Sequence, residues 1–169
     1  MAGEDGLKEC AVLCILQTGD QMLLLRRNKP GPLYGLYVPI GGHIEPHESP
    51  RQAAVREAHE EAGVTLESVE FRGVLVETSP VAYNWITFIY GAEVAEPFAP
   101  PSCPEGELTW VSRENLASLT TPATDAHIYR YVAQGQRFVL DATYDADVRL
   151  LTLVEELTGV VLRDSHATR

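Results

Sequence analysis

The residues best suited to chemistry lie between Gly42 and Val64. In this run two glycines and five charged residues stand at fixed spacing: Gly42, Glu48, Arg56, Glu57, Glu60, Glu61 and Gly63. If the segment is helical, Glu57, Glu60 and Glu61 occupy positions i, i+3 and i+4, so their carboxylates converge on one patch of surface. Like charges this close repel each other, and hard oxygen ligands suit Mg²⁺ or Mn²⁺. The spacing therefore predicts a divalent-metal site.

The element that must position these carboxylates is a helix, predicted over Pro50–Ala62. Ser49 followed by Pro50 provides an N-cap and a first-turn proline, and Gly63 ends the helix. The inward stripe is predicted to consist of Ala54, Val55, Ala58 and Ala62. The acidic residues are expected on the opposite side of the helix. Residues 36–42 are expected to form a strand that enters a tight turn at the glycine pair.

The rest of the chain alternates between apolar runs and turn-forming segments. Residues 10–16 and 22–27 read as a hairpin, and residues 28–35 and 95–106 as loops. Further strands are predicted at 36–39, 69–77, 85–94 and 107–111, with a final hairpin at 138–143 and 148–153. Short helices are predicted at 112–119 and 124–133. From these periodicities alone, the chain is an α+β domain.

Composition narrows the choice of partner and compartment. The 169 residues suit one domain, residues 1–169, with about 1–6 and 163–169 as flexible termini. The net charge of −11 argues against a nucleic-acid polymer as ligand. No apolar run reaches membrane-spanning length and the start is too acidic for a signal peptide, so we expect a cytoplasmic protein without a membrane partner. The three cysteines include no Cys-x-x-Cys pair, which disfavours a disulfide framework or a zinc site.

The spacing from Gly42 to Val64 also matches a known motif in every position. It resembles the Nudix box: Gly, five residues, Glu, seven residues, Arg-Glu, apolar, any residue, Glu-Glu, any residue, Gly, apolar. Upstream, LLLRRNKPGPLYGLYVPIGG is similar to the lead-in of MutT-type members, and EGELTWV from Glu105 to Val111 is similar to a feature of bacterial MutT-like diphosphatases. The resemblance implies the Nudix fold, a mixed β-sheet sandwiched between helices (α/β/α).

The chemistry implied by this resemblance is the attack of water on a phosphoryl centre, with metal ions neutralising the phosphate charge. Glu57, Glu60 and Glu61 are the expected metal ligands. The carbonyl of Gly42 is expected to add an oxygen, because glycine lets the backbone approach an ion closely. Glu48 is either a further ligand or a residue that supports one.

Three more roles follow from the resemblance. Arg56 is expected to form an orienting salt bridge to Glu48 or Glu57. The general base is placed differently among family members, so both Glu57 and Glu105 qualify. Arg26 is expected to contact phosphate oxygens of the substrate.

The substrate implied is a small nucleotide, and the cofactor is Mg²⁺ or Mn²⁺. The first interpretation is hydrolysis of a nucleoside triphosphate, such as the oxidised purine 8-oxo-dGTP, to monophosphate and pyrophosphate. An alternative is an ADP-ribose or nucleotide-sugar pyrophosphatase, supported by Pro80, which lies sixteen residues beyond Val64. A non-catalytic nucleotide-sensing module is a third interpretation, which the intact Arg-Glu and Glu-Glu positions disfavour.

Overall fold

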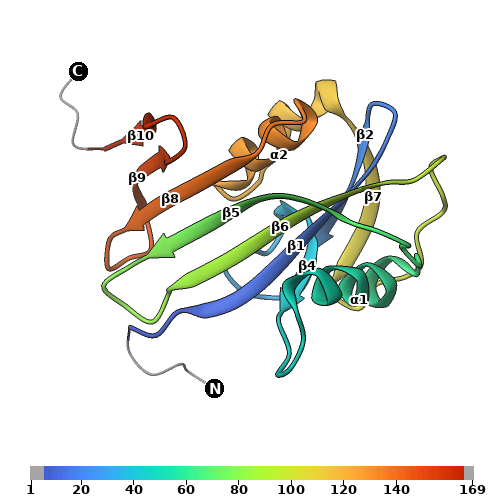
Figure 1. Cartoon of the computed structure of the whole chain (residues 1–169), viewed down its shortest axis with the longest axis horizontal. Helices are drawn as coiled ribbons and strands as arrows, with labels where there is room; N and C mark the ends of the chain where they lie inside the picture. The colour runs from blue at the N-terminus through green and yellow to red at the C-terminus, as the bar shows by residue number, and fades with distance from the viewer. Residues whose placement is uncertain (1–5, 166–169) are drawn as a thin grey trace.

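The computed structural model describes residues 6–165 of the chain (Figure 1). Its elements are the strands β1 (Glu9–Thr18), β2 (Gln21–Arg27), β3 (Tyr37–Val38), β4 (Ile40–His43), β5 (Glu70–Thr78), β6 (Trp85–Glu93), β7 (Gly106–Ser112), β8 (Phe138–Tyr144), β9 (Leu150–Glu155) and β10 (Val160–Asp164), and the helices α1 (Pro50–Ala62), η1 (Arg113–Ser118) and α2 (Asp125–Ala133).

The ten described strands form one mixed sheet. Its order is β10-β9-β8-β5-β6-β1-β2-β3, with β4 paired to β1 and β7 paired to β2. Strand β1 runs parallel to β6, and β5 runs parallel to β8, while the remaining pairs are antiparallel. The sheet thus brings β4, which precedes helix α1, into the same layer as the distant strands β5 and β8.

Helices α1 and α2 lie on opposite sides of this sheet (Figure 1). The alternation of side chains along β1 shows the two faces: Cys14 and Leu16 belong to the apolar cluster that includes Ala54 and Ala58 of α1. Ile15 belongs to a second cluster, which includes Ile128 of α2. The arrangement confirms the predicted α+β fold with a mixed sheet between helices.

Several predicted elements are confirmed closely. The predicted helix has the bounds of α1, and the predicted helix at 124–133 corresponds to α2. Strands β1 and β2 form the predicted hairpin, with Thr18 opposite Gln21. The strands predicted at 69–77 and 85–94 correspond to β5 and β6.

Two local predictions were wrong. Gly41 and Gly42 do not form a turn but belong to strand β4, where they lie opposite Leu13 and Val12 of β1. A Cβ atom at Gly41 would overlap the carbonyl oxygen of Val12, so glycine is needed here for the close approach of two strands. By contrast, the short helix predicted at 112–119 is confirmed as a 3₁₀ helix over residues 113–118.

The second correction concerns the C-terminal end, where residues 163 and 164, expected to be flexible, belong to strand β10. The rest of the predicted flexible termini falls largely on residues 1–5 and 166–169, outside the described residues. No helix within residues 6–165 is long and apolar enough to cross a membrane.

Candidate active site

Helix α1 is fixed at both ends by local contacts. The backbone amide of Gln52 donates to the Ser49 hydroxyl at 3.2 Å, and the Ser49 amide donates to the Gln52 side chain at 2.9 Å. This reciprocal pair is a capping box. Gly63, with a left-handed φ of 68°, ends the helix, and its amide donates to the carbonyl of His59. These caps determine which helical residues face strand β4.

One face of α1 holds Glu57 and Glu61 against β4. Glu57 is buried, with only 8% of its surface exposed, and it lies so close to Gly42 that a Cβ atom there would overlap its Oε1. The amide of Gly41 donates to Oε2 of Glu61 at 3.4 Å. The prediction that the acidic residues lie on the solvent side is therefore wrong for Glu57, because the glycine strand leaves space for a carboxylate between helix and sheet.

The two carboxylates repel each other electrostatically. Burial and the negative charges of Glu57 and Glu105 together raise the pKa of Glu61 to about 7. The positive charge of Arg27 acts in the opposite direction and lowers the pKa of Glu61. A cation placed between Glu57 and Glu61 would remove this repulsion.

The oxygen-rich surroundings of Glu57 and Glu61 fit a hard divalent cation. No three His, Cys, Asp or Glu side chains within residues 6–165 form a cluster that would hold a metal unaided. Mg²⁺, however, commonly binds through one or two carboxylates, with water and substrate phosphates completing the octahedron. The backbone beside Gly42 offers further oxygens. Glu60, the third predicted ligand, lies on the more exposed side of the helix, with 56% of its side chain exposed.

Arg56 connects two acidic residues of α1 with Glu48, which precedes the helix. Its Nε and Nη2 atoms donate to the two carboxylate oxygens of Glu48 at 2.9 and 3.0 Å. Nη1 donates to Glu57 at 2.7 Å and to Glu60 at 3.2 Å, and Nη2 also donates to the carbonyl of His43 at 3.0 Å. The hydrogen bonds from Arg56 lower the pKa of Glu48. Arg56 thus contacts both of its expected partners and fixes the position of Glu57 relative to β4.

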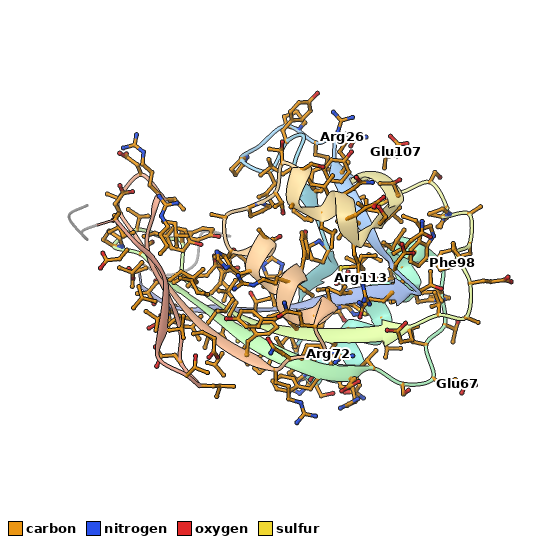
Figure 2. All side chains as sticks on the ribbon, turned by 90° about the horizontal axis from the view of Figure 1, so that it is seen from above. Arg26, Glu67, Arg72, Phe98, Glu107 and Arg113 are labelled. Atoms are coloured by element: carbon orange, nitrogen blue, oxygen red, sulfur yellow. The ribbon has the colours of Figure 1, made fainter. Side chains whose placement is uncertain are left out.

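The neighbouring arginines of β2 have different surroundings. Arg26 is exposed and lies opposite Glu107 of β7, at the outer edge of the molecule (Figure 2). Arg27 forms an ion pair with Glu105, which also pairs with Lys29 at 3.3 Å. The Nε atom of Arg27 is buried and has no hydrogen-bond partner among the described residues. Arg27, rather than the predicted Arg26, therefore stands beside Glu61 and Glu105.

A cavity of about 250 Å³ opens next to these residues. Glu61, Arg27 and the Gly41–Gly42 backbone line one part of it, and Glu77 and Asp125 line another. Strands β6 and β1 separate β5, which carries Glu77, from β4. Three strand spacings correspond to ~14 Å. The cavity can therefore accommodate an elongated ligand with a polar group at each end.

Two aromatic side chains line the cavity. They are Tyr83 and Trp85, whose rings lie 6.5 Å apart. Trp85 also packs against His43, at 5.2 Å between ring centroids. Trp110 instead packs against the apolar cluster beneath α1, and Tyr34 is largely exposed.

Glu77 and Asp125 are cavity residues that the sequence analysis missed. Glu77 follows Gly73 and Leu75 at the alternate positions of β5 that face α2, and such positions are normally apolar. An acidic residue in an inward position of a strand was the available signal. Asp125 gave no such signal, because aspartate at a helix start is ordinary.

The family follows from comparison with known proteins. A family model described as the NUDIX domain matches residues 7–132. The chain belongs to the Nudix family, and it is a MutT-like hydrolase of that class.

Individual relatives agree with this assignment. Over 144 residues the chain is 28% identical to the uncharacterized Nudix hydrolase YvcI of Bacillus subtilis (strain 168), covering 82% of this chain and 89% of the relative. It is 34% identical over 83 residues to putative 8-oxo-dGTP diphosphatase 3 of Mycobacterium tuberculosis, covering 47% of this chain and 38% of that protein.

Among solved structures, the MutT protein from Bacillus halodurans superposes with a TM-score of 0.77 at 26% identity, over 88% of this chain and 98% of that one. Other relatives carry names that refer to different substrates. The comparisons therefore establish the class of enzyme but not its substrate.

Proposed function

We propose that this enzyme hydrolyses nucleoside triphosphates, oxidised or not, to the monophosphate and pyrophosphate, with Mg²⁺ or Mn²⁺. The observation that carries the proposal is the cavity, which is lined by the Glu61 carboxylate of α1, by Arg27 and by the aromatic side chains of Tyr83 and Trp85. A triphosphate chain fits the charged end, and a nucleoside fits the apolar and aromatic remainder.

The acidic residues of α1 would hold the metal. Glu57 and Glu61, with the carbonyl of Gly42, provide oxygens beside the cavity, and Glu60 and Glu48 stand farther along the Arg56 network. When bound, the metal supplies positive charge for the phosphate oxygens. Arg56 holds Glu57 in place through the 2.7 Å hydrogen bond, so that the carboxylate keeps one orientation.

Glu105 is our choice for the general base, which the sequence left open between Glu57 and Glu105. Glu57 is buried and engaged by Arg56, as suits a metal ligand. Glu105 is 35% exposed, and its charge raises the pKa of Glu61, so it stands close to that carboxylate. Its ion pairs with Arg27 and Lys29 hold the Glu105 carboxylate beside Arg27, a residue of the cavity lining, where it can accept a proton from water.

Arg27 takes the phosphate-binding role first given to Arg26. Its guanidinium lines the cavity and its Nε lacks a partner among the described residues, so it can donate to an anionic oxygen of the substrate. Pro80, which supported ADP-ribose as the alternative substrate, lies between β5 and β6 and does not line the cavity. No contact of Pro80 in the structure favours that alternative.

A substrate panel tests the proposal directly. Deoxynucleoside triphosphates and ADP-ribose are compared with Mg²⁺ and with Mn²⁺, and pyrophosphate, orthophosphate and monophosphate are measured separately. We expect triphosphates to exceed ADP-ribose by ~10-fold or more in kcat/KM, which corresponds to ~1.4 kcal/mol of transition-state stabilisation. The expected phosphate product is pyrophosphate.

A pair of adjacent variants provides the control. Arg27→Ala should reduce the ratio of kcat/KM for triphosphates to kcat/KM for ADP-ribose, because a charge-assisted contact to the phosphate chain is lost. Arg26→Ala removes the same charge from the outer side of the same strand and should leave this ratio of kcat/KM values unchanged. A higher kcat/KM for ADP-ribose than for every triphosphate would contradict the proposed function.

A further inference from the structure

A second cavity, of about 440 Å³, lies between the helices η1 and α2. On η1 it is lined by Arg113, Leu116 and Ala117. On α2 it is lined by Ala126 and by the residues three, four and seven positions farther on, which share one face of the helix. The other lining residues are Tyr129, Arg130, Ala133 and Gln134. Among residues 6–165, none lines both this second cavity and the candidate active site.

Small side chains leave the second cavity open. Ala117 of η1 and Ala126 and Ala133 of α2 end at their Cβ atoms, and no residue of η1 is buried, so the two helices do not close over each other. Tyr129 contributes a rigid part of the wall. It is 1% exposed, and its hydroxyl donates to the carbonyl of Tyr37 at 3.1 Å. The second cavity is therefore formed without a ligand, as small-molecule sites commonly are.

Two positive charges line the second cavity without a negative partner. Arg113 (Figure 2) and Arg130 form no ion pair with a carboxylate of the described chain, and no acidic residue of that part lines the cavity. Acidic residues outnumber lysines and arginines by 24 to 13 in the sequence. A cavity with two arginines and no carboxylate therefore departs from the charge of the rest of the chain, and it favours an anionic ligand.

Both arginines belong to segments with fixed positions. The backbone amide of Arg113 donates to the carbonyl of Asp20 at 2.7 Å, which attaches the start of η1 to the turn between β1 and β2. The guanidinium of Arg130 lies over the ring of Tyr131, 5.2 Å from its centroid. Burial and the positive charge of Arg130 together lower the pKa of His127, as expected beside a cation that no carboxylate neutralises.

The charge of the arginines selects the class of ligand. We propose that the second cavity binds a small phosphate monoester, with the phosphate between Arg113 and Arg130 and the organic group against the alanines and Tyr129. A phosphate monoester carries about −1.5 to −2 charges at pH 7, which balances two guanidinium groups, whereas a carboxylate would balance only one. Guanidinium groups also donate in pairs to phosphate oxygens.

The second cavity is a separate site from the one proposed for hydrolysis, but the two share a helix. Asp125, the first residue of α2, lines the candidate active site, and Ala126, the next residue, lines the second cavity. The inference therefore goes beyond the proposed function, because its ligand is not the substrate and its residues take no part in the reaction.

Binding is measured by ¹⁵N–¹H NMR spectra of the metal-free protein in EDTA, without requiring hydrolysis. The probes are phenyl phosphate, benzoate and benzamide, which share a ring and differ in charge. We expect phenyl phosphate to give saturable shifts at the amides of Ala117, Ala126 and Ala133, with a Kd of about 1 mM or below. It should bind about 10-fold or more tightly than benzoate, and benzamide should not bind. Shifts confined to Gly41 and Gly42, or equal affinities for the probes, would overturn the inference.

A pair of double variants tests the arginines. Arg113→Gln/Arg130→Gln should weaken the binding of phenyl phosphate about 10-fold or more, because both charge-assisted contacts are lost. Arg149→Gln/Arg163→Gln removes the same two charges from exposed residues outside the second cavity and should keep the wild-type affinity. An equal weakening in both double variants would show a non-specific attraction to positive charge and would overturn the inference.

A variant that fills the second cavity tests the position of the organic group. Ala133→Leu keeps both arginines and a good helix former, and its larger side chain should reduce the affinity for phenyl phosphate about 10-fold or more. A wild-type affinity in this variant would place the ring elsewhere and contradict the proposal. Arg113→Gln/Arg130→Gln should also retain triphosphate hydrolysis, because neither residue lines the candidate active site. Loss of hydrolysis in that double variant would refute the separation of the two sites.

Discussion

Asp125 illustrates how one buried residue links stability to pH. Its pKa rises from an ordinary 3.8 to about 7 because it is buried, and because Glu77 adds negative charge nearby. At pH values between 3.8 and about 7, Asp125 keeps its proton in the folded protein but has released it in the unfolded chain. The free energy of unfolding therefore falls as the pH rises from about 4 to about 7. The stabilising contribution of the protonated acid is complete below this window and lost above it.

We expect Asp125→Asn to remove this pH dependence, because an amide does not titrate. As the pH rises from 4.5 to 7.5, the free energy of unfolding of the variant should increase relative to that of wild type by on the order of 2 kcal/mol. Urea denaturation of both proteins at several pH values measures the difference. Parallel stability curves across this range would show that Asp125 does not hold a proton in the folded state.

Single residues also mark the limit of what the sequence predicts. The roles proposed for Glu57 and Arg56 come from a local motif, and the structure places both side chains in contact with strand β4. The sequence could not show which of Arg26 and Arg27 faces the cavity. Adjacent strand residues face opposite sides of a sheet, and no local motif indicates which side contains the site. Glu77 lacks any motif, since its surroundings come from strands far away in the chain.

At the scale of elements, the contact between β4 and α1 forms the candidate metal site. Gly42 leaves the space that the carboxylate of Glu57 occupies. We expect Gly42→Ala to displace Glu57 and to lower kcat by ~100-fold, as for loss of ~3 kcal/mol of metal-based charge stabilisation. Steady-state kinetics measures the loss, and circular dichroism checks that the strand content is retained. A variant with near-normal kcat would show that the close contact between Gly42 and Glu57 is not needed.

The elements differ in how well the sequence predicts them. Helix α1 was predicted to the residue because its signals are local: Ser49 and Pro50 at the start and Gly63 at the end. Strand β4 was missed because its glycines are typical of turns, and only pairing with β1 makes them part of a strand. Strand β10 was missed for a related reason, since its partner β9 provides the hydrogen bonds that order it.

At the scale of the whole molecule, metal binding should increase the stability of the folded protein. A ligand that binds only the folded state raises the free energy of unfolding by mass action. We expect millimolar Mg²⁺ or Mn²⁺ to raise the melting temperature of the wild-type protein at neutral pH, with scanning calorimetry as the measurement. The paired carboxylates repel each other without the cation, which adds to the expected gain.

Two variants test whether the metal binds at the carboxylates of α1. In Glu57→Gln/Glu61→Gln the metal-dependent rise should disappear, while Glu67→Gln, whose side chain points away from the sheet in Figure 2, should retain it. An equal rise in all three proteins would place the metal elsewhere on this chain of net charge −11.

The order of the sheet could not be predicted from periodicity, because strand patterns do not specify their neighbours. The resemblance to a family supplied the α/β/α arrangement, and the structure confirms it. The family model ends at residue 132, so it provides no expectation for β8 to β10. Their attachment through parallel pairing of β8 with β5 depends on contacts across about sixty residues of chain, as in Gly73 opposite Phe138.

The hydrogen bond from Tyr144 to Glu77 crosses that boundary. Tyr144 ends β8, beyond the part of the chain that the family model matches, whereas Glu77 lies within it. Exchange of the C-terminal strands would thus remove a hydrogen bond to a residue of the active-site cavity lining and leave helix α1 unchanged. One wall of the active-site cavity is therefore supported by a segment outside the family domain, and substitutions in that segment can reshape the cavity while helix α1 is preserved.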